Sequence, residues 1–364
     1  MYKLLALLTS MAIGSASTMS TAYADETISY EGGVVLNLQA TNDNRVNSDQ
    51  FASFDFVTNI QHGMGSWTLY FEANTDIRDD QVSAIIGEAN ADAGSALDED
   101  GNGRIQVSEL FYTLPALDGE LSIGMLDATG ALDASDVAND EGSQFVGGSF
   151  VNNPTIGFPD YSLGFIYTNH SETSGTGFSI VGLSSHGLGD NEHVSYEELF
   201  DIGDDHKGIF LAGEYQWQMS NSRWRAGVWT NTADNDHVDG SGKTSNNYGA
   251  YLSTDIMMGD NTVNVRAGVA NDEVSEADGF IAASIETKWL GDAMGFGIAK
   301  TFASDELSGA DDTTQAEVYS RFDINDSFQV TPSLQWISNS GFNDNNTAFD
   351  DDIIIAGVRL AYSF

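Results

Sequence analysis

The stretch "DIIIAGVRLAYSF", residues 352–364, decides the fold of this chain. Its residues alternate between two faces with a period of two, which is the period of a β-strand. The apolar face comprises Ile354, Ala356, Val358, Leu360, Tyr362 and Phe364. The opposite face comprises Ile355, Gly357, Arg359, Ala361 and Ser363. A strand of a soluble sandwich can show the same alternation, so other parts of the chain have to separate a soluble fold from a membrane fold.

The first 24 residues have the features of a secretory signal peptide. Lys3 gives a positive start, "LLALLTSMAIG" is an apolar core, and Ala22–Ala24 form an A-x-A cleavage site. The apolar run is too short, and too often interrupted by Ser, Thr and Gly, for a transmembrane helix. We therefore expect cleavage after Ala24, which leaves 340 of the 364 residues, and export of the protein.

The aromatic residue in the last position, Phe364, completes this pattern. After an export signal, such a strand resembles the terminal strand of bacterial outer-membrane barrels. The resemblance implies that the barrel-insertion machinery reads residues 352–364. It also implies an integral protein of the bacterial outer membrane, in contact with outer-membrane lipid and lipopolysaccharide.

The whole chain divides into sixteen candidate strands of suitable length. They span residues 28–40, 50–62, 66–76, 105–115, 119–126, 160–169, 177–185, 207–218, 222–232, 246–256, 261–270, 278–289, 293–303, 315–323, 328–338 and 351–364. Tight turns such as "GMG", "ALDG" and "MSNS" alternate with longer, more acidic connections. Short periplasmic turns and long outer loops are typical of outer-membrane barrels, whereas a sandwich has no reason to alternate in this way. We expect an all-β fold, a transmembrane antiparallel β-barrel of sixteen strands, as a single domain over residues 25–364.

Several strands carry their charged residues on one face only. In "SRWRAGVW", residues 222–229, both arginines lie opposite Trp224 and Val228. Because lipid does not solvate a charge, the polar faces have to line a lumen, and sixteen strands leave that lumen filled with water. The predicted pore-lining residues are Arg223, Arg225, Arg266, Arg321, Arg359, Glu214, Glu286, Glu317 and Tyr319. They can bind sugar hydroxyls, form the transverse field of an ordinary porin, or simply cancel one another's charge.

Pro332 is the exception among the predicted strands, because it lies inside 328–338 and has no N–H group to donate to the ladder. We expect a bulge or a local distortion of the sheet there.

Composition limits the function. The net charge is −42, or −43 without the signal peptide, which disfavours nucleic acid as a partner. The chain has no cysteine, so disulfides and thiol chemistry are excluded. No nucleophile elbow, HExxH motif or Gly-rich phosphate loop is present. We therefore expect passive diffusion of small hydrophilic solutes and no enzymatic activity.

The longest connection, residues 126–160, is the predicted constriction loop. It contains apolar residues such as Val137, Phe145 and Phe150, which an exposed loop does not need. Its position after the fifth strand matches the third outer loop, which folds into the lumen in general porins. The segment "ASDVANDEGSQFVGGSFVNNPTIGFPDYSLG", residues 134–164, resembles the corresponding region of the carbohydrate-selective porins. The resemblance implies a preference for sugars, and sixteen-stranded porins are often homotrimers.

A calcium motif lies in the predicted second outer loop, residues 77–104. The stretch "DEDGNGRIQVSE", residues 98–109, has the order of an EF-hand loop. The predicted ligands are the side chains of Asp98, Asp100, Asn102 and Glu109 and the carbonyl of Arg104. Because "LFYTL" follows as a strand, we expect structural Ca²⁺ that ties the outer loop to the barrel. An accidental acidic turn is the alternative.

Three functions stay open at this point. The first is a sugar-permissive diffusion porin, and the second is a general cation-selective porin, because an acidic mouth concentrates cations. The third is a calcium-dependent adhesin or receptor-like barrel. Planar-bilayer conductance separates the first two from the third, and reversal potential and sugar block separate the first two from each other.

Overall fold

A computed structural model describes residues 27–98, 100–171, 174–189, 195–200, 207–342 and 352–364, so the predicted signal peptide lies outside the described residues. The strands are β1 (Ile28–Thr41), β2 (Asp49–His62), β3 (Gly65–Asn74), β4 (Ile105–Ala116), β5 (Gly119–Leu126), β6 (Ser162–Ser171), β7 (Thr176–Ser184), β8 (Ile209–Met219), β9 (Ser222–Asp236), β10 (Thr244–Met258), β11 (Asn261–Ala270), β12 (Ala277–Thr287), β13 (Ala293–Ala303), β14 (Thr313–Asp323), β15 (Phe328–Ser338) and β16 (Asp352–Ser363). Short helices are α1 (Val82–Ile85), η1 (Gly87–Ala89), α2 (Gly148–Val151), η2 (Glu198–Phe200) and η3 (Ser340–Phe342). In this part of the chain, no helix has the length and apolar character needed to cross a membrane.

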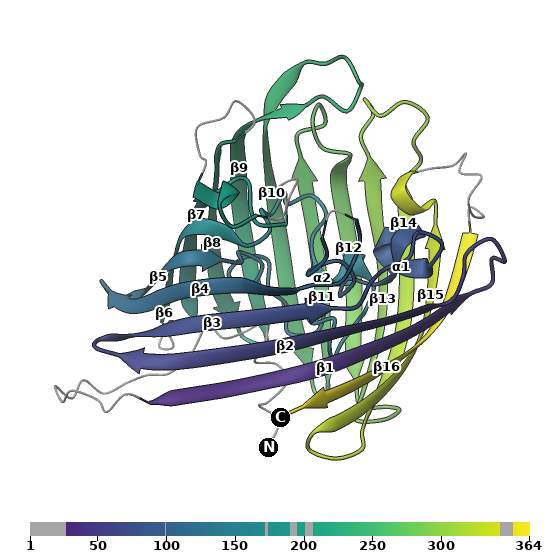
Figure 1. Cartoon of the computed structure of the whole chain (residues 1–364), viewed down its shortest axis with the longest axis horizontal. Coiled ribbons are helices and arrows are strands. Elements are labelled where there is room, and N and C mark those ends of the chain that lie inside the picture. Colours follow the sequence, from purple (N-terminus) through teal and green to yellow (C-terminus); the bar gives the residue numbers. More distant parts are fainter. Residues whose placement is uncertain (1–26, 99, 172–173, 190–194, 201–206, 343–351) are drawn as a thin grey trace.

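Each strand pairs antiparallel with its neighbours in sequence, and β1 also pairs with β16, so the sheet closes into a barrel (Figure 1). At this seam Gly33 lies opposite Ser363 and Thr41 lies opposite Ile355. The predicted sixteen-stranded antiparallel barrel is confirmed. The strand bounds agree within a few residues, because a period of two between turn residues is a strong local signal.

The two faces of the wall differ as the sequence predicts. On β16, Ile354, Val358 and Tyr362 are exposed on the outside, whereas Ile355 and Arg359 are buried on the lumen side. Strands β13 and β15 show the same alternation. An apolar belt can therefore face lipid while polar groups face the interior.

The predicted distortion at Pro332 takes a mild form. The β14–β15 ladder pairs Tyr319 with Ser333 and Phe322 with Val330 in one unbroken register, so there is no bulge. The pairing lapses only between these two positions, around Pro332. The missing N–H group thus costs local pairing without shifting the strand.

Two long connections fold into the barrel. We call residues 75–104, between β3 and β4, loop L2, and residues 127–161, between β5 and β6, loop L3. Figure 1 shows α1 of L2 and α2 of L3 within the outline of the barrel, and α2 contacts β12 and β13. The interior is therefore divided, with the loops against the C-terminal strands.

The middle of L2 lies inside the barrel, although the sequence predicted an outer loop. Six side chains with no exposed surface hold it there: Val82, Ile86 and Ala89 of L2, and Ile337, Ile353 and Ile355 of the wall. These isoleucines occupy lumen positions of β15 and β16, where water would otherwise meet apolar surface. Burying them stabilises the inward position of L2.

Candidate functional site

Aromatic packing fixes the middle of L3. The ring of Phe145 lies 4.7 Å from that of Phe150 and 4.9 Å, edge on, from that of Tyr319. Phe150 covers Gly297, where a Cβ would lie 2.6 Å from its ring. We call this wall of β11–β14 the L3 socket, and define it by five residues on its lumen face: Arg266, Gly268, Gly297, Glu317 and Tyr319.

Arg266 is the most connected residue of the socket. It is 1% exposed, and its guanidinium donates to four L3 carbonyls. The distances are 2.7 Å to Ala138, 3.2 Å to Asp133, 3.4 Å to Val151 and 3.5 Å to Phe150. A single side chain therefore joins the two halves of L3, and its planar fork of donors suits this task.

The other predicted lumen arginines also contact L3 or support it. Arg321 donates to the carbonyl of Ser143 at 3.2 Å, and Arg359 donates to that of Gln144 at 2.9 Å. Arg223 pairs with Asp136 of L3 at 2.6 Å. Arg225 pairs with Asp255 of β10.

The predicted acidic residues and tyrosine play a similar part. Glu317 accepts the N–H groups of Val146 at 3.1 Å and Gly147 at 2.8 Å. Glu214 accepts the N–H group of Asp133 at 2.7 Å. Tyr319, beneath Phe145, donates to Glu286 at 2.6 Å. All nine predicted pore-lining residues thus lie on the lumen side, and none of them is among the residues of the open cavity described below.

L2 is held by three lumen glutamines. Gln39 and Gln335 each donate to the carbonyl of Ala89 at 2.8 Å. Gln315 donates to the carbonyl of Glu88 at 2.8 Å and accepts the N–H group of Ser149, so it joins L2 to L3. A direct bond from Ala91 to the carbonyl of Val146, 2.8 Å long, completes the link. The two loops therefore form one inner body.

The open cavity lies on the other side of this body, along β2–β6. It has a volume of about 640 Å³. Its lining extends from Gly94 and Ser95 of L2 to Ser66 and Glu120 beside the short turns. Aromatic rings, hydroxyls and amides contribute, and seven carboxylates do so too: Glu72, Asp92, Glu109, Glu120, Asp127, Glu141 and Asp160. None of the described residues that line it is a lysine or an arginine.

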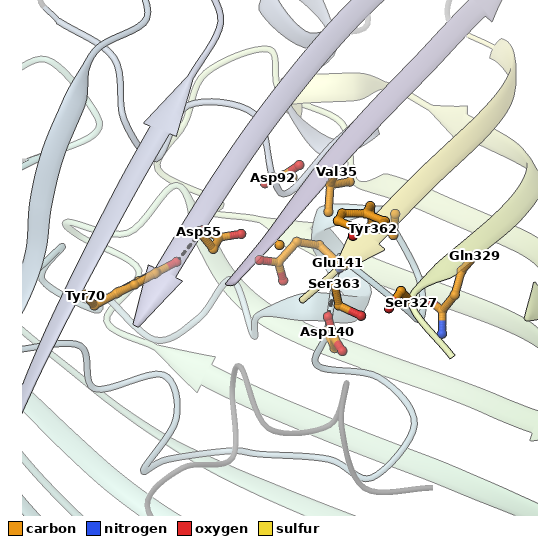
Figure 2. A pocket seen from close by; sticks show the side chains of 13 residues that line it. Val35, Asp55, Tyr70, Asp92, Asp140, Glu141, Ser327, Gln329, Tyr362 and Ser363 are labelled. Atoms are coloured by element: carbon orange, nitrogen blue, oxygen red, sulfur yellow. Dashed lines mark hydrogen bonds between the residues drawn. The ribbon is translucent and has the colours of Figure 1, made fainter. Parts of the chain in front are cut away.

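Carboxylates gather where L2 and L3 approach the β1–β3 wall. A small adjoining cavity, about 70 Å³, is lined there by Asp55, Tyr70, Asp92 and Glu141 among others. Figure 2 shows the carboxylates of Asp55 and Glu141 turned toward one another, with Asp92 beyond them. Tyr70 donates to Asp55 at 2.7 Å, and Asp92 accepts from Ser53 at 2.8 Å.

These loop carboxylates are hard to ionise. Burial raises the pKa of Asp92 to about 6, with a further contribution from Glu72, while Ser53 and Arg359 oppose the rise. Burial also raises the pKa of Glu141 well above its ordinary value, helped by Asp140 and Asp92. Each carboxylate disfavours the charge of the next, as expected for like charges in a confined space.

The sequence reasoning missed the lining on β2–β4. The signal was present in "GSWTLYFEAN", residues 65–74, where Ser66, Thr68, Tyr70 and Glu72 share one face. The pore-lining residues predicted from the sequence lie instead on strands of the C-terminal half, which carry the inward-facing arginines. Which lumen residues remain open depends on where the loops settle, and alternation along a strand does not report that.

The predicted calcium ligands are only partly brought together. The carboxylate of Asp98 accepts the N–H groups of Asp100 at 3.0 Å and Asn102 at 2.8 Å. The carbonyl of Arg104 accepts the N–H group of Asn74 at 3.3 Å. Glu109 lies on β4 in the lumen, where it accepts the N–H group of Asp127 at 2.8 Å.

The backbone of this loop also departs from the motif. Gly101 has the left-handed conformation, with φ 78°, whereas Gly103 lies directly against the carbonyl of Asn74. In the described part of the chain, no group of three or more His, Cys, Asp or Glu is placed to hold a metal ion. The complete predicted ligand set is therefore not brought together in this arrangement, and calcium binding by residues 98–109 stays a prediction of the motif.

Comparison with known families matches residues 67–364 to the family described as "Carbohydrate-selective porin, OprB family". No curated protein matches the sequence. Among solved structures, OprB of Pseudomonas putida superposes with a TM-score of 0.69 and 15% identity, over 93% of this chain and 94% of that one. OmpT of Vibrio cholerae, in its trimer form, gives 0.59 and 13%, over 94% and 100%. A mutant porin of Rh. blastica gives 0.55 and 12%, over 93% and 100%.

Proposed function

This chain belongs to the OprB family of carbohydrate-selective porins, and from that premise we propose that it carries out passive diffusion of small neutral sugars. It is an integral protein of the bacterial outer membrane. The observation that carries the proposal is the cavity of about 640 Å³ along β2–β6.

The lining of this cavity suits a hydroxylated ring. Thr68, Ser122 and Thr168 offer hydroxyl groups, and Tyr70 and Phe111 offer aromatic faces. Hydroxyls and carboxylates exchange hydrogen bonds with sugar hydroxyls, while aromatic faces cover apolar C–H groups. No step requires a chemical change in the solute.

The proposal is tested by measuring the conductance of purified protein in planar bilayers and the uptake of sugars into liposomes that contain it. We expect stepwise conductance in the bilayers and swelling of liposomes in isotonic glucose. Conductance that neutral sugars neither block nor reduce would contradict the sugar preference while leaving the channel itself intact. Failure to conduct at all would contradict the channel and favour a receptor-like barrel.

A second candidate is a general cation-selective porin without sugar preference. It is favoured by one observation, the seven carboxylates of the lining without a lysine or arginine among the described residues. Reversal potential under a salt gradient measures this property, and sugar block is independent of it. The two candidates are therefore separable in one apparatus.

Further interactions complete the proposal. We propose that the protein is a homotrimer, because OmpT of Vibrio cholerae, which has the same fold, has a trimer form. We also propose that the barrel-insertion machinery recognises residues 352–364, and that the turn at Asp98–Asn102 binds calcium, on the strength of its sequence motif.

A further inference from the structure

The placement of L3 raises the question of what keeps it off the open cavity. L3 lines the cavity with Asp127, Glu141 and Asn152, and its other side lies in the L3 socket. A small movement of L3 away from the socket would therefore carry it into the passage. We propose that Arg266 is a positioning residue that keeps the passage open by holding L3 against the socket.

The bonding of Arg266 supports this role. Its guanidinium is directed at backbone carbonyls on both halves of L3, at 133 and 138 and at 150 and 151. Its Nε lies 3.6 Å from a carboxylate oxygen of Asp133, so the L3 chain also neutralises its charge. A residue that is 1% exposed and whose charge is met in this way does not present a field to a passing solute.

The wall around Arg266 is shaped for the loop. Two glycines, Gly268 on β11 and Gly297 on β13, hollow the lumen face on either side. A Cβ on Gly268 would overlap the Oγ1 of Thr155, and a Cβ on Gly297 would crowd the ring of Phe150. Shape and hydrogen bonding therefore act together, and each can be changed without the other.

This inference rests on the proposed channel function, and the experiment separates the two. The measurement is single-channel recording of the wild type, of Arg266→Met and of Gly297→Val. Arg266→Met removes the donors, whereas Gly297→Val fills the socket and leaves every charge in place. Lys300→Met is the matched control, because Lys300 lies on the lipid-facing side of β13, paired with Asp312.

We expect steady open levels, without frequent closures, for the wild type and for Lys300→Met. Both socket variants should show frequent closures. In Arg266→Met the open times should shorten ~10-fold or more, the factor that follows from losing one hydrogen bond to a charged group. Should Arg266→Met not assemble, Gly297→Val carries the test. Steady, unchanged levels in the socket variants would overturn the inference, as would a changed reversal potential without closures. Absence of conductance in the wild type would instead overturn the proposed function.

A reversible tether provides the rescue. The chain has no cysteine of its own, so Thr155→Cys with Gly268→Cys introduces a single pair. The overlap at this point brings their Cβ atoms within the ~4 Å that a disulfide spans. Oxidation of this pair in the Arg266→Met background should restore a steady level, and reduction should bring back the closures. Closures that persist with the disulfide formed would show that L3 is not the moving part.

Discussion

The guanidinium of Arg225 lies 2.7 Å from the carboxylate of Asp255, and the two side chains are only 5% and 1% exposed. Asp255 also accepts bonds from Ser135 of L3 and from Asn264. The pair therefore ties β9 and β10 to the start of L3 from a position sealed away from water.

Removing the cation of this pair should be costly. Arg225→Met removes the cation that faces the buried carboxylate of Asp255, so we expect a loss of about 3–5 kcal/mol in the free energy of unfolding. Arg223→Met is the matched control, because its ion pair with Asp136 is 33% and 40% exposed and contributes only about 0.2–1 kcal/mol. Urea unfolding followed by tryptophan fluorescence in lipid vesicles measures both, and equal losses would contradict the assignment.

The charge of the cavity should govern ion selectivity. Under a potassium chloride gradient we expect a reversal potential that favours cations, because carboxylates line the passage. Glu120→Gln should reduce that preference, because Glu120 is an exposed carboxylate of the lining. Asp239→Asn, in the connection between β9 and β10 away from the cavity lining, should leave it unchanged. The preference should also weaken in concentrated salt, where the Debye length falls to ~3 Å at 1 M. Anion selectivity at low salt would refute the prediction.

Selectivity should depend on pH in one direction. A carboxyl with a raised pKa is neutral below that pKa, and the pKa of Asp92 is about 6. Lowering the pH from 8 through about 6 should therefore weaken cation preference step by step, as Asp92 takes up a proton. All the variants keep the groups that face Asp92, namely Asn37, Ser53, Glu72, Asp140 and Arg359. Asp92→Asn should flatten the change near pH 6, and an unaltered profile in that variant would rule out Asp92 as its source.

Calcium binding can be tested by substituting the first and the twelfth residue of the motif, Asp98 and Glu109, one at a time. If the turn binds calcium as the motif predicts, the ion should protect L2 from protease, and Asp98→Asn should abolish that protection. Because Glu109 lies in the lumen on Asp127, Glu109→Gln tells whether the twelfth position joins the site. Asp118→Asn, in the short turn between β4 and β5, is the control. Protection that is equal in Asp98→Asn and the wild type would mean that the turn is merely acidic.

The barrel was predictable because each strand carries its own signal. The alternation around Arg359 and Ile354 and the turn residues between strands depend only on local sequence, and the structure reproduces them. The contents of the lumen were less accessible. Arg266 and Glu317 were recognised as inward-facing, but their partners are backbone groups of L3 more than a hundred residues away. Alternation reports the direction of a side chain and not the loop that it meets.

One feature of the sequence could have predicted the inward position of L2. Ile337, Ile353 and Ile355 are apolar residues at lumen positions, which a water-filled barrel does not explain. Another segment therefore has to shield these three side chains from water, and L2 does so. Apolar residues on the lumen face of a strand thus indicate that a loop packs against them.

The contacts of L3 also constrain the order in which the protein folds. Glu317 bonds to a residue 170 positions earlier, and Arg359 bonds to one 218 positions earlier. L3 is thus made long before the strands that receive it. Because contacts so far apart in sequence are slow to form, L3 can reach its final position only after β14 and β16 exist. A partly assembled barrel would therefore hold L3 unseated, and the seating of L3 on β14 and β16 would report completion of the wall.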